Sequence, residues 1–107
     1  MTAIVVKHSA PALHKWPTAP KHRAYLRNSH RHVFTYIVHL EVLHTDRDVE
    51  FHDLQDFIRD WVTDDWQGDA CESIAVSLRG AVCARWPNRK CTTEVWEDAE
   101  CGAVVDG

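Results

Sequence analysis

The sequence contains no apolar run long enough to cross a membrane, and it has no excess of positive charge. A membrane-spanning helix needs roughly 20 consecutive apolar residues, whereas the apolar segments here are short and broken by charges. The 12 Lys and Arg residues are outnumbered by 16 Asp and Glu, which leaves a net charge of -4. A dedicated nucleic-acid-binding protein normally shows a basic stripe. The composition therefore argues against nucleic acid and against a membrane as partners.

A secretory signal and closely spaced cysteines are also missing. The N-terminal 15 residues lack a basic stretch followed by a long apolar segment, so we expect a cytoplasmic protein. No two of the four cysteines form the Cys-x2-Cys pair of a zinc knuckle; they are Cys71, Cys83, Cys91 and Cys101. Four cysteines could form two disulfides in a secreted protein, but the expected compartment predicts reduced thiols with a structural role.

Histidine, in contrast, is abundant. The chain has 107 residues, among them eight His and five Trp, and this length suits a single domain spanning residues 1–107. A domain of this size buries a limited core and often gains stability from a metal or from oligomerisation. The histidines therefore raise the question of a metal site.

The apolar patterns predict the element order β-β-α-α-β-β, which is an α+β domain. Strands are expected at 3–6, 30–43, 90–96 and 101–105, with helices at about 52–63 and 70–85. The strand at 30–43 is the clearest, because one of its faces is apolar at every second residue from Phe34 onward. That face should point toward the core.

Two local predictions accompany this order. Residues 9–29 contain three prolines and are expected to form a long, ordered loop, and loops of that length are usually functional. Asp69 is expected to be the N-cap of the second helix, with Glu72 as the second carboxylate of a capping box.

His30 and His32 are the first indication of a metal site. They are two residues apart on a predicted strand, so both imidazoles point to the same face. Two imidazoles placed in this way can share one Zn²⁺ ion. His14 and His22, both in the preceding loop, are the candidates for the third ligand. The alternative is a histidine pair at a strand end with no metal.

Five segments, in this order along the chain, resemble the 6-pyruvoyl- and 6-carboxy-tetrahydropterin synthase family. They are SAPALHKWP at 9–17, HRH at 30–32, VEFHDL at 49–54, CESIA at 71–75 and VWED at 95–98. The family equivalents are an SAAHRLP-like segment, HGH, V-x-DF-x-DL, PT-x-EN-x-A and V-x-V-x-E-T. The resemblance covers most of the chain. It implies the tunnelling fold (T-fold), an antiparallel four-stranded sheet with two helices on one face.

The resemblance also implies a ligand set for zinc. By position, the three zinc-binding histidines of the family correspond to His14, His30 and His32, and the context ALHKWP favours His14 over His22. A zinc ion held by three protein ligands keeps one position open, which is typical of a catalytic or substrate-binding site.

The family anchors a pterin or purine ring with a carboxylate, and Glu97 of VWED stands at that position. A carboxylate can accept two hydrogen bonds from the amino group and ring N–H of a guanine-like edge. Trp16, beside His14, is a candidate to line the pocket and stack on a flat ring.

The chain departs from the family at the groups that move protons. The family has a catalytic Cys shortly before HGH and an Asp-His pair after the first helix. Here AYLRNS precedes His30, and Trp66 stands where that His should be. Other groups could serve as catalytic acid and base, for example Asp65, His52 or a zinc-bound hydroxide.

Three functions are consistent with these residues. The first is a zinc-dependent enzyme of the pterin-synthase type, acting on a pterin or a substrate of the 7-deazaguanine (queuosine-type) pathway. The second is a non-catalytic T-fold protein that binds a pterin, guanine or deazapurine. The third is an interaction module that zinc merely stabilises. The resemblance further implies a homo-oligomer, in which subunits join edge to edge into barrels that stack into hexamers or similar assemblies.

Overall fold

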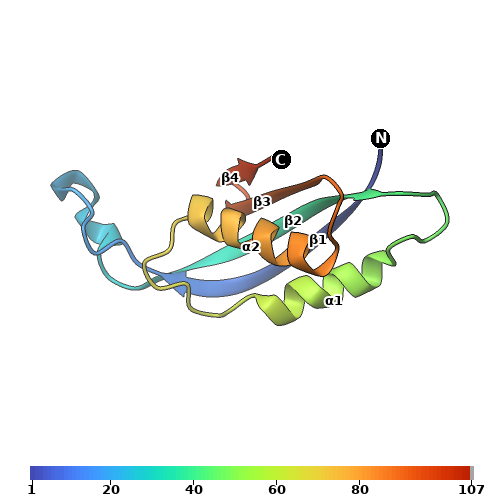
Figure 1. Cartoon of the computed structure of the whole chain (residues 1–107). Helices are drawn as coiled ribbons and strands as arrows, with labels where there is room; N and C mark the ends of the chain where they lie inside the picture. The colour runs from blue at the N-terminus through green and yellow to red at the C-terminus, as the bar shows by residue number, and fades with distance from the viewer. Residues whose placement is uncertain (107) are drawn as a thin grey trace.

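The computed structural model describes residues 1–106 and shows a four-stranded antiparallel sheet with two helices on one face (Figure 1). The strands, in their order across the sheet, are β1 (Thr2–His14), β2 (His30–Val42), β3 (Cys91–Glu97) and β4 (Cys101–Val105). The helices are α1 (Phe51–Trp61), α2 (Cys71–Arg85) and the short 3-10 helix η1 (Lys21–Leu26). The predicted order β-β-α-α-β-β is confirmed. No helix in the described part of the chain is long and apolar enough to span a membrane.

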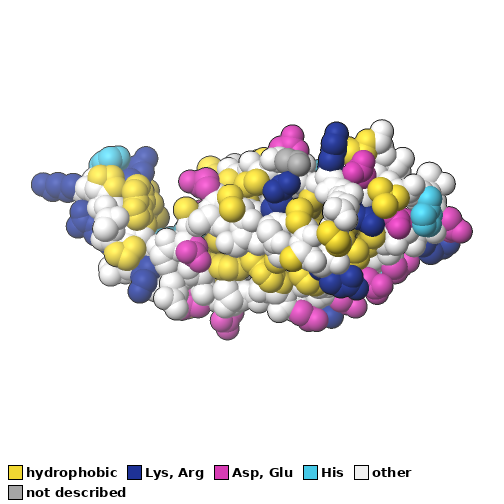
Figure 2. Space-filling view, viewed as in Figure 1, with side chains coloured by type: hydrophobic (Ala, Val, Ile, Leu, Met, Phe, Trp, Pro, Cys, Tyr) yellow, Lys and Arg dark blue, Asp and Glu magenta, His cyan; other side chains and the backbone are white. Residues whose placement is uncertain are grey.

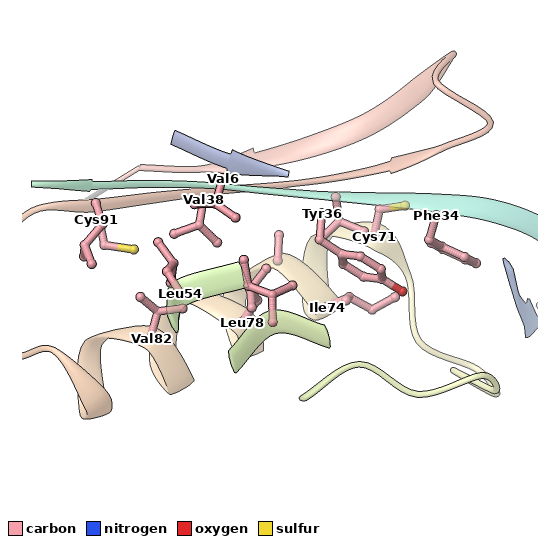
Figure 3. Close-up of a cluster of buried hydrophobic side chains, with 14 of the residues drawn as sticks. Val6, Phe34, Tyr36, Val38, Leu54, Cys71, Ile74, Leu78, Val82 and Cys91 are labelled. Atoms are coloured by element: carbon pink, nitrogen blue, oxygen red, sulfur yellow. The ribbon is translucent and has the colours of Figure 1, made fainter. Parts of the chain in front are cut away.

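The hydrophobic core lies between the sheet and the two helices (Figure 3). Every second residue of β2 faces the helices, and from Phe34 to Leu40 these side chains are at most 1% exposed. The helices contribute fully buried side chains to the same core, namely Leu54, Ile58, Ile74, Leu78 and Val82. The alternation in β2 therefore predicted the core face of the sheet correctly, because a half-buried strand repeats every two residues.

Strand β1 is much longer than the sequence predicted, and the expected loop at 9–29 begins only at residue 15. Proline in a strand is tolerated at an edge, where its missing N–H faces away from the neighbouring strand. Leu13 donates its N–H outward, to the carbonyl of Asp64 at 2.8 Å, and Pro11 occupies the equivalent position two residues earlier. The extra residues bring His14 opposite His30 in the register of the two strands.

The capping box predicted for α2 is absent. The N-cap is Ala70, whose side chain makes no capping hydrogen bond. Asp69 instead donates its backbone N–H to the carbonyl of Trp66 at 3.0 Å. The turn before α2 is attached to β1, since Trp66 N–H donates to the carbonyl of Leu13 at 2.8 Å and Lys15 N–H donates to that of Gln67 at 2.7 Å. These bonds set the start of the helix.

Residues 15–29 form an arm that projects from one end of the sheet (Figure 1). The arm holds four of the 12 basic residues and none of the 16 acidic ones. Lys and Arg side chains accordingly gather on it in the space-filling view (Figure 2). The arm begins just after His14 and ends just before His30, so its base lies beside the histidines, and Lys15 is its one basic residue that lines the same cavity in the described part of the chain.

We expect the same substitution, glycine to alanine, to have opposite effects on stability at two positions. A Cβ at Gly102 of β4 would lie 2.5 Å from the carbonyl oxygen of Val95 and 2.7 Å from the ring of Trp96, whereas a Cβ at Gly80 in α2 meets nothing within 4 Å. We expect Gly102→Ala to lower the free energy of unfolding by about 1–3 kcal/mol, because the strand must shift. Gly80→Ala should raise it by about 0.5–1 kcal/mol, because alanine favours the helix. Urea unfolding of both variants measures these changes, and changes of the same sign would contradict this account.

Candidate metal centre

Three histidines from two neighbouring strands meet at the end of the sheet where the arm begins. His14 of β1 is paired with His30 of β2, and His32 is two residues further along β2 on the same face. One ring nitrogen of each lies within 4.8 Å of the others. The ring centroids are 4.4 to 5.0 Å apart and the rings meet edge to face. This group could hold a metal ion, and it contains the three residues favoured by the sequence.

Two of the imidazoles are oriented by hydrogen bonds on their outer nitrogens. His30 Nδ1 donates to the backbone carbonyl of Asn28 at 2.8 Å, and His32 Nδ1 donates to the carboxylate of Asp98 at 2.6 Å. In a neutral imidazole, a proton on Nδ1 leaves a lone pair on Nε2. Histidines that bind metals are typically oriented in this way by a second hydrogen bond.

The inner nitrogens have the environment that a metal ion requires. Nε2 of His30 and Nε2 of His32 are buried and have no hydrogen-bond partner. An unsatisfied buried polar atom is costly, so such atoms call for a specific partner. Burial lowers the pKa of His14, against the opposing effect of the Glu97 charge, and this favours the neutral imidazole that a metal binds. The donor set and its orientation therefore fit a metal ion such as Zn²⁺.

Glu97 lies next to the histidines. Its position at the end of β3, paired with Phe34 of β2, places its carboxylate on the helix side of the sheet. Its oxygens lie 3.4 Å from His14 Nε2 and 3.6 Å from His32 Nε2. The side chain is 24% exposed, so the carboxylate can be reached from solvent while it lies beside the Nε2 atoms of His14 and His32.

The tight turn after β3 positions Asp98. Asp98 and Ala99 both have positive φ angles, of 52° and 57°, and Glu100 N–H donates to the carbonyl of Glu97 at 3.0 Å. Positive φ angles at both central residues are typical of a type I′ turn, and residues 98–100 connect the paired residues Glu97 and Cys101. Asp98 also accepts the N–H of Val33 at 2.9 Å, and that hydrogen bond, followed by the one from His32, lowers its pKa. The carboxylate therefore stays ionised and holds His32 in one tautomer.

We expect Asp98→Asn to weaken zinc binding by roughly 10–100-fold, the usual effect of losing an outer hydrogen-bond partner of a ligating histidine. Competition with a chromogenic chelator measures the affinity. Glu100→Gln is the matched control, since Glu100 is an exposed carboxylate of the same turn. An unchanged affinity for Asp98→Asn would show that Asp98 does not orient the metal ligand.

The three imidazoles line a cavity of about 510 Å³ that opens to solvent. The arm contributes Lys15, Trp16 and Leu26, the turn and start of α2 contribute residues 68–72, and β3 and β4 contribute Glu97, Cys101 and Gly102. A cavity of this volume is within the range that holds small organic ligands. Trp16 is 45% exposed, so one part of its indole is available to a bound molecule.

Cys71 is a cavity residue that its sequence position did not reveal. Its thiol donates to Glu97 at 3.6 Å, and burial together with the Glu97 charge raises its pKa to about 12. Cys71 is therefore a neutral hydrogen-bond donor at neutral pH and not a thiolate nucleophile. All four cysteines are free thiols.

The remaining sequence candidates are exposed and do not belong to the histidine group. His22 is exposed on η1, and His52 is exposed at the start of α1, where its ring pairs with Glu50 at 2.9 Å. Asp65 is exposed too, and its carboxylate accepts the backbone N–H of Gln67 at 2.9 Å. None of these three side chains lines the cavity in the described part of the chain.

Comparison with models of known protein families and with curated proteins finds no match for this chain.

Proposed function

We propose that the protein is a zinc-dependent enzyme of the 6-pyruvoyl-/6-carboxy-tetrahydropterin synthase type, acting on a pterin or a 7-deazaguanine-pathway substrate. The observation that carries this proposal is the group of three imidazoles from paired strands, with two buried, unpartnered nitrogens facing a cavity. His14, His30 and His32 would hold the ion. Zinc bound there would act as a Lewis acid toward a substrate oxygen.

The chain's own residues would bind and orient the substrate. Glu97 lies in the cavity wall and could accept two N–H groups from the edge of a pterin or guanine ring. Trp16 lines the same cavity and offers an aromatic face for stacking. Lys15 at the base of the arm would attract an anionic side chain or phosphate on the substrate.

Metal analysis and a turnover assay test this proposal. Purified protein should contain about one zinc ion per chain, as three histidine ligands imply. With zinc bound, it should convert dihydroneopterin triphosphate or a related compound to product, which chromatography would detect. A zinc-loaded protein that leaves these compounds unchanged is not such an enzyme.

A second function is favoured because neither of the predicted catalytic acid-base candidates lines the cavity. His52 and Asp65 are not among the residues that line it, and Cys71 is a neutral thiol. A protein with this site could bind a pterin, guanine or deazapurine without turnover. Thermal-shift measurements with such compounds separate the two functions, because binding without product supports the second. Glu97→Ala should abolish the shift in either case.

We also propose that the protein forms a homo-oligomer. In the described part of the chain, β1 and β4 are the edges of the sheet, and both helices lie on the same side of it. The opposite face exposes Val5, Val33 and Val104, which are 49%, 49% and 57% exposed. Edge-to-edge joining of subunits would pair the edges and shield that face in a barrel. Light scattering coupled to size-exclusion chromatography gives the molar mass; a mass near 12.3 kDa would contradict the proposal.

A further inference from the structure

The carboxylate of Glu97 lies beside two of the three histidines that we propose bind the metal. One of its oxygens is 3.4 Å from His14 Nε2 and the other is 3.6 Å from His32 Nε2. Four ligands that surround zinc at about 2.0–2.1 Å in a tetrahedron are about 3.3–3.4 Å from one another. These two separations are close to those between neighbouring ligands of one zinc ion. Glu97 lies outside the group whose ligand atoms are all within 4.8 Å of one another, so its carboxylate would move toward His30 when it completes the set.

The charge of Glu97 also requires a partner. Its side chain is 24% exposed, and its ion pairs within residues 1–106 are with His14 and His32 only. If both imidazoles are neutral, as metal binding demands, they give the carboxylate no positive charge. A partly buried carboxylate without a cation is costly, so a divalent ion between these groups would compensate for the charge.

We propose that Glu97 is the fourth metal ligand in the ligand-free protein, so that the site is closed by three histidines and one glutamate. This inference rests on the proposed metal site. Zinc accepts carboxylate oxygen alongside imidazole nitrogen. The Cys71 thiol donates to one Glu97 oxygen and helps to hold the carboxylate beside the ion. Glu97 cannot hold a substrate edge with both oxygens and bind zinc at the same time, so a bound pterin would open the fourth position.

Cobalt substitution tests the coordination directly, because the visible absorption of Co²⁺ reports the number and type of its ligands. Glu97→Gln should alter the Co²⁺ spectrum and weaken Co²⁺ binding roughly tenfold or more, since even an outer-shell partner contributes that much. The variant should also gain a spectral response to added thiocyanate, which would occupy the position that Glu97 leaves. The wild-type protein should respond to thiocyanate weakly or not at all.

Two controls keep the outcomes distinct. Glu72→Gln removes another carboxylate from the cavity wall. Within the described residues this carboxylate makes no ion pair with the histidines, so the variant should leave the Co²⁺ spectrum and affinity unchanged. Metal-free thermal unfolding shows whether Glu97→Gln is folded. If wild-type protein binds no Co²⁺, the metal site itself and the proposed function fail. If it binds one Co²⁺ and Glu97→Gln has the same spectrum, affinity and thiocyanate response, only the fourth ligand is wrong.

Discussion

Replacing His32 with alanine is expected to abolish stoichiometric zinc binding. The wild-type protein should retain about one zinc ion per chain through dialysis, as a site with three histidine ligands implies, and His32→Ala should retain almost none. His32 is the ligand with the strongest support, because Asp98 holds its outer nitrogen at 2.6 Å and leaves the inner one buried and unpartnered. Elemental analysis after dialysis measures the loss.

His22→Ala is the matched control for this experiment. It removes an exposed histidine of the arm that lies outside the group of three, so its zinc content should equal that of wild type. Zinc affinity should fall as the pH drops, because protonated imidazoles cannot bind the ion. Burial lowers the pKa of His14, so this residue is protonated at a lower pH than an ordinary histidine. Equal zinc retention by His32→Ala and wild type would contradict the assigned site.

Variants of the grouped histidines also distinguish a metal that only stabilises the fold from a metal with a function. If zinc merely stabilises an interaction module, metal-free His14→Ala and His32→Ala should be unfolded, and Glu97→Ala should change nothing. The buried core argues for a different result, because its fully buried side chains lie between the sheet and the two helices and include none of the three histidines (Figure 3). We expect the metal-free variants to keep their far-ultraviolet circular dichroism.

Leu78→Ala is expected to cause a large loss of stability, lowering the free energy of unfolding by about 2–5 kcal/mol. Leu78 is completely buried in α2 and belongs to the core cluster between the sheet and the two helices. Truncation removes three carbon atoms from the core, and the surrounding strands cannot fully close the resulting cavity. A loss of this size is a large part of the 5–15 kcal/mol that usually separates folded from unfolded states.

Val76→Ala is the matched control for this prediction. Val76 lies two residues away in the same helix but is 58% exposed, so its truncation should change the free energy of unfolding by no more than about 0.5 kcal/mol. Denaturant unfolding of the metal-free proteins measures both values without a contribution from zinc. Similar losses for the two variants would mean that α2 does not face the sheet as described.

Much of the fold could be predicted from the sequence, because the buried side chains recur at the regular spacing of a strand or a helix. The alternation in β2 and the apolar stripes of α1 and α2 are signals that extend over three or more repeats. The second half of β1 has no such signal, since Pro11 and small residues dominate it. Its strand conformation comes from pairing with β2, an interaction between residues far apart in the chain.

The three grouped histidines were predictable, but the residues that support them were not. The two-residue spacing of His30 and His32 is a local signal, whereas Asp98 reaches His32 only because a hairpin turn brings it beside Val33. Glu97 and Asp98 are adjacent in sequence, and nothing local shows that both contact the histidines. The contact of Cys71 with Glu97 depends in the same way on where α2 starts relative to the sheet.

The pairing of His14 with His30 has a further consequence for the arm. These two residues flank the segment 15–29. An ion bound by both would therefore act as a cross-link that closes this segment into a loop. Closing a loop in advance removes chain entropy that would otherwise oppose its ordering. Metal occupancy and the order of the arm are then thermodynamically linked. Since the arm carries Trp16 and Lys15 into the cavity wall, the ion that the histidines hold would also determine how firmly that wall is in place.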